Sequence, residues 1–194
     1  MHAIEPYFQW RDYYTAENDR RSPFFNRIYD EFEFKNTIYN YYIHPQWDFF
    51  GSSTLYMKIL YSNYERGFTI IELIGEWNDT LHNDIMYLKR NIADHLIEMG
   101  IYKFILICDN VLNFHPSDNL YLEEWFNDII EENGWVAAIN LLDHVYADFE
   151  DNYVQEYVYF DEDINELDWR MMKPEKVFDF VDQHIENTPK KLIY

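Results

Sequence analysis

The residues best able to do chemistry in this sequence follow two apolar runs of the chain. Asp109 and His115 come after the first run, and Asp143 and His144 come after the second. If both runs are parallel strands, their carboxyl ends meet at the edge of the sheet where α/β proteins place ligands. Imidazole and carboxylate groups can bind a metal ion or transfer protons there. With Glu76 on an earlier strand, these residues support one hypothesis, a small metal-assisted hydrolase.

Two glutamates on the same apolar run add to the titratable candidates. Glu72 and Glu76 flank Gly75 within residues 68–77, where most neighbours are apolar. A carboxyl group that leaves water on burial has a raised pKa. We expect at least one of the two to titrate abnormally, although exposure at the edge of a sheet would leave both ordinary.

One segment resembles the beginning of a calcium loop but departs from it at two positions. Asp161, Asp163 and Asn165 have the spacing of the first ligands of an EF-hand. Glu166 stands where the sharp turn needs glycine, and Met172 stands where the bidentate glutamate is needed. The sequence therefore predicts a solvated acidic loop. No glycine-rich phosphate loop, HExxH pair or GxSxG turn is present in the sequence, so no cofactor is expected.

The charge of the chain limits the partners that it can take. The formal net charge is −21, and residues 109–194 carry −16 of it. Such a surface repels nucleic-acid phosphates and anionic lipid headgroups, so we expect neither nucleic-acid nor membrane binding. A basic protein partner remains open. The N-terminal residues lack the pattern of a secretory signal, and the expected location is the cytoplasm.

Hydrophobic periodicity predicts a single α/β domain with a mixed sheet and a βαβ core. Two strands form an antiparallel hairpin, and each later strand follows a helix that ends near a glycine, Gly100 or Gly134. The expected elements are strands at 54–61, 68–77, 104–108 and 135–141, and helices at 84–99 and 118–133.

The remaining segments are placed around this core. Residues 1–36 form an aromatic N-terminal arm that packs on the body, 37–194, and that could serve a homodimer. Other expected elements are strands at 37–43 and 153–160, a connecting loop at 109–116 and a C-terminal helix that begins at Pro174.

The run from Phe104 to Trp125 resembles the STAS fold of anti-sigma factor antagonists, the SpoIIAA-like group. A buried strand ends in an aspartate, and a short loop then leads to a serine at the start of a helix. The resemblance implies a regulatory binding module that is switched by phosphorylation at that position. Carried over by position, the switch residue is Ser117 and Asp109 ends the strand. The family continues from its serine into a small residue and glycine, whereas Ser117 is followed by Asp118 and Asn119.

Together these observations favour a non-enzymatic regulatory or interaction module of the cytoplasm that binds a protein partner. Contact is expected around His115, Ser117 and Asp118, with the acidic segment 143–168 selecting a basic partner by charge. Ser117 is alternatively an ordinary helix N-cap. The metal-assisted hydrolase with His115 and His144 is the second hypothesis.

Overall fold

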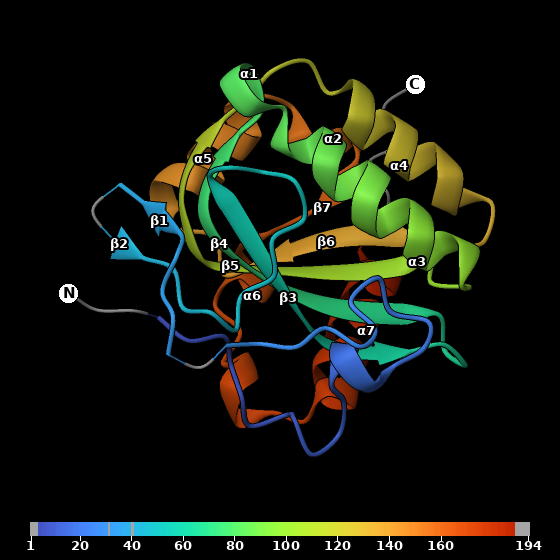
Figure 1. Ribbon diagram of the computed structural model, residues 1–194. Coiled ribbons are helices and arrows are strands. Elements are labelled where there is room, and N and C mark those ends of the chain that lie inside the picture. Colours follow the sequence, from blue (N-terminus) through green and yellow to red (C-terminus); the bar gives the residue numbers. More distant parts are fainter. Residues whose placement is uncertain (1–3, 31, 40, 189–194) are drawn as a thin grey trace.

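A five-stranded mixed sheet forms the centre of the protein (Figure 1). The structure is a computed structural model that describes residues 4–30, 32–39 and 41–188. Its strand order is β3-β4-β5-β6-β7, in which β3 pairs antiparallel with β4 and the other pairs are parallel. The single α/β domain with a mixed sheet is therefore confirmed. The strands are β3 (Leu55–Asn63), β4 (Phe68–Asn78), β5 (Lys103–His115), β6 (Trp135–Ile139) and β7 (Val158–Tyr159).

Helices cover one face of the sheet through an apolar stripe. The predicted helix 84–99 is present and consists of α2 (Asp84–Leu88), a π-helical turn η2 (Lys89–Ala93) and α3 (Asp94–Glu98). Three- and four-residue spacing places one side of this helix against the sheet. α1 (Asp79–His82), α4 (Leu120–Ile130) and α5 (Asp143–Asp151) complete the layer. The buried residues of the stripe are Ile85, Leu88, Ile92 and Leu96.

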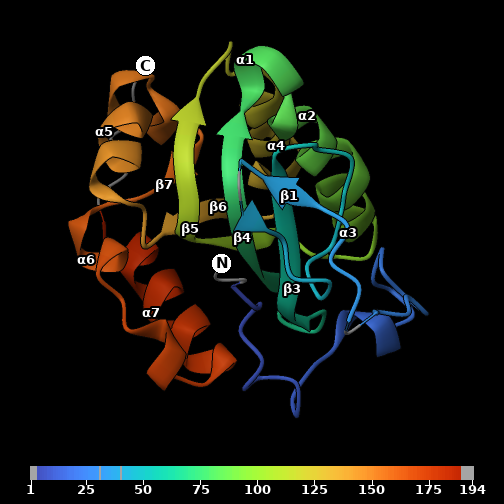
Figure 2. The ribbon, with the colours of Figure 1, turned by 60° about the vertical axis from the view of Figure 1, so that its left-hand side comes forward.

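The opposite face is covered by the C-terminal helix, by the arm and by short helical turns (Figure 2). Pro174 begins α7 (Pro174–Asn187), as expected, and the ring of Phe178 stacks on Phe68 with centroids 3.9 Å apart. Across the described residues, no helix combines the length and apolarity that crossing a bilayer requires. The short elements are η1 (Ala16–Asn18), η3 (Val154–Glu156), α6 (Glu162–Asn165) and η4 (Trp169–Met171).

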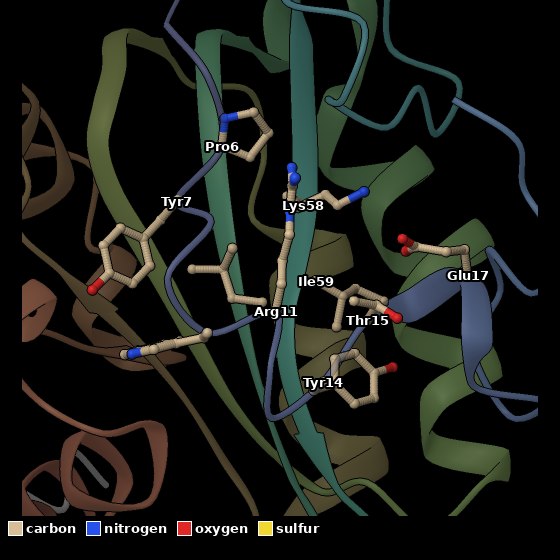
Figure 3. Close-up of a pocket in the computed structure, with 10 residues that line it drawn as sticks. Pro6, Tyr7, Arg11, Tyr14, Thr15, Glu17, Lys58 and Ile59 are labelled. Atoms are coloured by element: carbon tan, nitrogen blue, oxygen red, sulfur yellow. The ribbon is translucent and has the colours of Figure 1, made fainter. Parts of the chain in front are cut away.

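The arm lies against β3 and β4 and encloses one small cavity. Trp10 and Ala16 are buried on opposite sides of β3. Lys58 of β3 and Glu17 of η1 point toward each other at the cavity wall (Figure 3). The cavity has a volume of about 10 Å³, which is room for about one water molecule.

The predicted strand 37–43 is wrong, because the chain turns back within it. β1 (Thr37–Ile38) pairs antiparallel with β2 (Tyr41–Tyr42), and Tyr39 begins the turn with φ +52°. Aromatic residues favour extended structure on either side of this turn. The result is a small hairpin that covers the carboxyl end of β4 through the buried side chain of Ile38.

The predicted loop 109–116 is also wrong, since β5 continues to His115. The pairing of β5 with β4 survives two register shifts, each of which adds a residue to β5. Such bulges let a strand stay paired with its neighbour where polar residues interrupt its run of apolar residues. Asp109 therefore lies within the strand and does not end it.

The acidic segment contains more helix than the sequence predicts. The strand expected at 153–160 is reduced to the two residues of β7, which lies at the sheet edge, and α5 precedes it. After α4, Asn133 rather than Gly134 has the positive φ. A Cβ at Gly134 would lie 2.3 Å from the carbonyl oxygen of Tyr102, so close packing is the reason for this glycine.

Gly75 provides a test of how tightly the hairpin is fitted to β4. It has φ +121°, and a Cβ there would lie 2.4 Å from Cδ1 of Ile38 in the hairpin and 2.2 Å from the carbonyl oxygen of Thr54. We expect Gly75→Ala to lower the free energy of unfolding by about 3 kcal/mol in urea denaturation. Gly100→Ala is the control, since its φ is +90° but a Cβ would meet nothing within 4 Å. Equal losses in the two variants would contradict a packing role for Gly75.

Candidate functional site

A hydrogen-bonded cluster lies where β4 and β5 reach their carboxyl ends. Glu76 is nine-tenths buried, and its Oε1 lies 2.9 Å from Nε2 of His115. The same oxygen accepts a hydrogen bond of 3.0 Å from the side-chain amide of Asn78. Oε2 accepts from the hydroxyl of Tyr39, and this bond raises the pKa of that phenol. Two of the candidate residues, Glu76 and His115, therefore lie in contact, with the imidazole half-exposed.

Two further carboxylates, those of Asp79 and Asp84, follow this cluster in the chain, at the starts of α1 and α2. Asp79 accepts hydrogen bonds from the indole of Trp77 and the main-chain amide of Ile85. Burial raises the pKa of Asp79 to about 7, and the nearby Asp84 adds to the shift. Asp84 is fully buried, and its Oδ2 accepts from Asn78 N at 2.8 Å. These groups fix the turn that leads from β4 into α1.

The segment 115–119 is held to both neighbouring elements and leaves its polar side chains at the surface. Thr80 of α1 donates to the carbonyl of Pro116 at 2.6 Å, and Asn119 donates to the carbonyl of Asn152 at 2.9 Å. Ser117 and Asp118 are exposed. The N-cap of α4 is Asn119, so the alternative of Ser117 as the N-cap is wrong. The Ser117 hydroxyl donates locally to the carbonyl of Asp118.

The β1-β2 hairpin lies beside this segment and exposes aromatic rings. Figures 1 and 2 both place it next to the carboxyl end of β4. Tyr39 links the hairpin to the strand ends, because its hydroxyl bonds Glu76 and lies 3.4 Å from the amide of Asn113. Tyr39 and Tyr41 expose 59% and 56% of their surface. We call Tyr39, Tyr41, Tyr42 and residues 115–118 the edge surface.

Asp109 lies apart from the edge surface, among the arm and the turn before α7. Its carboxylate pairs with Arg170 at 2.5 Å and accepts from the indole of Trp169 at 3.0 Å. Arg170 also approaches Glu72, whose Oε2 accepts from Tyr7 N at 2.8 Å. Burial raises the pKa of Glu72 to about 7, which confirms that one of the two strand glutamates titrates abnormally. Since β4 is central and both glutamates are buried, edge exposure does not describe them.

The second predicted histidine lies on the other side of β5. His144 is exposed at the start of α5, and its Nε2 lies 2.7 Å from the carbonyl oxygen of Leu112. Asp143 beside it is exposed. Within the described residues, the group of three metal-ligating side chains found within 4.8 Å of one another consists of Asp161, Asp163 and His184. The structure thus joins His115 to Glu76, but does not gather His115, His144 and Asp143 into such a group.

Several members of the cluster are missed by sequence reasoning. Tyr39 lies in the middle of the run predicted as one strand, 37–43, and Asn78 and Asp79 are not among the candidates from the sequence. Tyr39 reaches Glu76 because the hairpin folds over β4, and a local pattern does not report this contact. The dipeptide Tyr39-Asn40 is the available signal, since asparagine favours tight turns.

No family model matches the chain, and no curated protein matches it. Among solved structures, the anti-sigma factor antagonist SpoIIAA in its unphosphorylated form has a TM-score of 0.47 and 12% identity. That match covers 66% of this chain and 96% of SpoIIAA. The phosphorylated form of SpoIIAA, a Bacillus cell fate determinant, has a TM-score of 0.42 and 11% identity, over 64% and 98% of the two chains. The likeness agrees with the resemblance drawn from the sequence.

The raised pKa of Asp79 predicts how stability depends on pH. The pKa rises from 3.8 to about 7 on folding, so the folded state keeps a proton that the unfolded state has lost. This stabilisation is complete below pH 3.8 and is lost as the pH rises through 7. Relative to Asp79→Asn, we expect the wild type to lose about 2–3 kcal/mol of unfolding free energy between about pH 5 and pH 8.

Urea denaturation at the two pH values measures this difference. Asp179→Asn is the control, because Arg66 and Lys176 lower the pKa of Asp179 and it titrates below its ordinary value of 3.8. This variant should follow the wild-type pH dependence across the same range. An Asp79→Asn variant that also follows the wild type would show that Asp79 is already ionised at pH 5.

Proposed function

We propose that the protein is a non-enzymatic regulatory module that binds a basic protein partner through the edge surface. The observation that carries this proposal is the exposure of Tyr39 and Tyr41 on a hairpin whose Tyr39 shares Glu76 with His115 of the exposed segment 115–118. Tyrosine is enriched at binding hot spots because a rigid ring gives a large contact area and its hydroxyl gives a polar contact. The ring of Tyr39 stays in place without a partner, since its hydroxyl is hydrogen-bonded to Glu76.

A preorganised surface of this kind favours binding. Ordering flexible side chains in a complex costs about 0.5–1.5 kcal/mol for each one. Thr80 and Asn119 hold the segment 115–119 at both ends through main-chain carbonyls, and Asn78 and Tyr39 hold Glu76. The edge surface therefore loses little conformational freedom when a partner binds.

The acidity of the chain supports the choice of a basic partner. Residues 109–194 carry a formal charge of −16, and α5, at the start of the acidic segment 143–168, packs beside the end of β5. A field of one sign attracts an oppositely charged protein and raises the association rate at low salt. The affinity should accordingly fall as the salt concentration rises.

Ser117 is the proposed switch of this surface. Its side chain is exposed in the centre of the segment 115–119 and next to Asp118. A phosphate there adds a charge of about −2 within the contact itself, where the cost of removing its water exceeds the gain from attraction to a basic partner. Cytoplasmic location is part of the same proposal.

The role of the aromatic rings of the edge surface is tested by replacing one of two equally exposed tyrosines at a time. Tyr41 and Tyr13 expose 56% and 55% of their surface, but Tyr13 belongs to the arm. The full chain is used to capture proteins from the source cell's lysate, and the affinity of each captured protein is measured for the variants. We expect Tyr41→Ala to raise the Kd at least about tenfold, because a hot-spot residue contributes more than about 1 kcal/mol. Tyr13→Ala should change the Kd less than about twofold. Equal effects of the two changes, or no partner sensitive to Tyr41→Ala, would contradict the proposal.

The switch is tested separately in the same binding assay. Ser117→Asp should weaken binding of the partner at least about fivefold, because it puts a charge into the contact. Ser117→Ala should leave binding unchanged, since the hydroxyl bonds only to the adjacent carbonyl. Equal affinities of the Asp and Ala variants would remove Ser117 as a switch and would leave the aromatic contact intact.

A further inference from the structure

A second candidate site lies away from the edge surface, in the C-terminal part of the chain, where the start of α6 lies beside α7. Asp161, Asp163 and His184 each offer one ligand atom, and these atoms all lie within 4.8 Å of one another. The carboxylate of Asp161 already contacts Nε2 of His184. We propose that these three residues form a binding site for a divalent transition-metal ion of the zinc class. The site is independent of the edge surface and of the function proposed for it.

The backbone around the three ligands is fixed by packing. Ile164 of α6 is buried against the same cluster as Val181 and Ile185 of α7. His184 lies between these two α7 residues in sequence, so the buried stripe of the helix sets where its ring points. The side-chain amide of Asn165 bonds both the amide and the carbonyl of Leu141. The two aspartates are therefore held next to the histidine by contacts in which no ligand atom takes part.

The ligand atoms are also suitably placed and available. Asp161 is the N-cap of α6 and uses Oδ1 to accept from Ile164 N at 3.1 Å, which leaves Oδ2 directed at His184. Asp163 is exposed, so its side chain can rotate toward the pair. Ligands at about 2.1 Å from a tetrahedral ion lie about 3.4 Å apart. A small rotation of Asp163, together with an opening of the close contact between Asp161 and His184, brings the three donors to this spacing.

The donor set selects the class of metal. Calcium and magnesium prefer oxygen ligands alone, whereas an imidazole nitrogen with two carboxylates suits zinc and its neighbours. Two carboxylates and a neutral imidazole also cancel the charge of a divalent ion. Three protein ligands leave the fourth tetrahedral position to water. The spacing that resembles an EF-hand in the sequence thus belongs to a different site, because His184 from α7 provides the third ligand and Asn165 is committed to Leu141.

Titration of the metal-free full chain with Co²⁺ and with Zn²⁺ tests this site. Co²⁺ should give the intense visible absorption of tetrahedral coordination, and Zn²⁺ should displace it at one equivalent. Zn²⁺ should also raise the temperature of unfolding, as any ligand of the folded state does. His184→Ala and Asp163→Asn should each weaken Zn²⁺ binding at least about tenfold.

Two control variants separate the site from general attraction to an acidic surface. His144→Ala removes an exposed histidine elsewhere, and Asp168→Asn removes one negative charge near α6 without touching the three ligands. Both should keep the wild-type affinity for Zn²⁺. Circular dichroism in the absence of metal checks that each variant is folded. If His184→Ala does not fold, Asp163→Asn still tests the site. Equal Zn²⁺ affinity of all four variants, or displacement of Zn²⁺ by equimolar Ca²⁺, would overturn the proposal.

Discussion

The complete burial of β4 is the constraint on which the rest of this structure depends. All eleven residues of the strand are buried, and two of them are glutamates. A buried carboxylate is unfavourable unless hydrogen bonds or a counter-charge compensate for the lost water. The arm and η4 provide these for Glu72 through Tyr7 and Arg170. The hairpin and the end of β5 provide them for Glu76 through Tyr39 and His115. The segments that cover the sheet are thereby fixed to its centre.

The two glutamates differ in what surrounds them. Glu72 lies deep under the arm, where burial raises its pKa to about 7. Glu76 lies at the carboxyl end of the same strand, where its partners reach the surface. The hydrogen bonds that satisfy Glu76 also hold Tyr39 beside the segment 115–118. An internal requirement of the fold thus produces an ordered, exposed patch, and the proposed partner-binding role follows from this arrangement.

Much of the fold could be predicted from the sequence, because the sequence pattern within each central strand and helix indicates that element by itself. The apolar runs of β3, β4 and β6, the stripe of α2 to α3 and the proline that begins α7 are patterns of periodicity and capping. The errors fall where tertiary contacts override such patterns. β5 stays paired with β4 through bulges although its sequence becomes polar after Cys108, and 37–43 folds into a hairpin that packs on Ile74 and Gly75.

The candidate site was accessible to sequence reasoning only in part. His115 and Glu76 are each candidates from the sequence, but their direct contact is found only in the structure. Asp109 is expected beside His115 only if the strand stops at Cys108, and the structure places it elsewhere. His184 joins Asp161 and Asp163 through the packing of α7, about twenty residues further along the chain. A contact of this kind leaves no local signal. The same holds for the burial of Asp79 and Asp84.

Hydrogen exchange measured by mass spectrometry, on the free chain and on its complex with the captured partner, tests the central claim most directly. Amides in complexed surfaces exchange more slowly, and each peptide reports its own part of the chain. The account predicts slower exchange in the peptides that contain β2 and residues 112–120, with α7 and β3 unchanged. Slower exchange confined to α7, to the arm or to the edge strand β3 would contradict it, because the partner would then bind elsewhere.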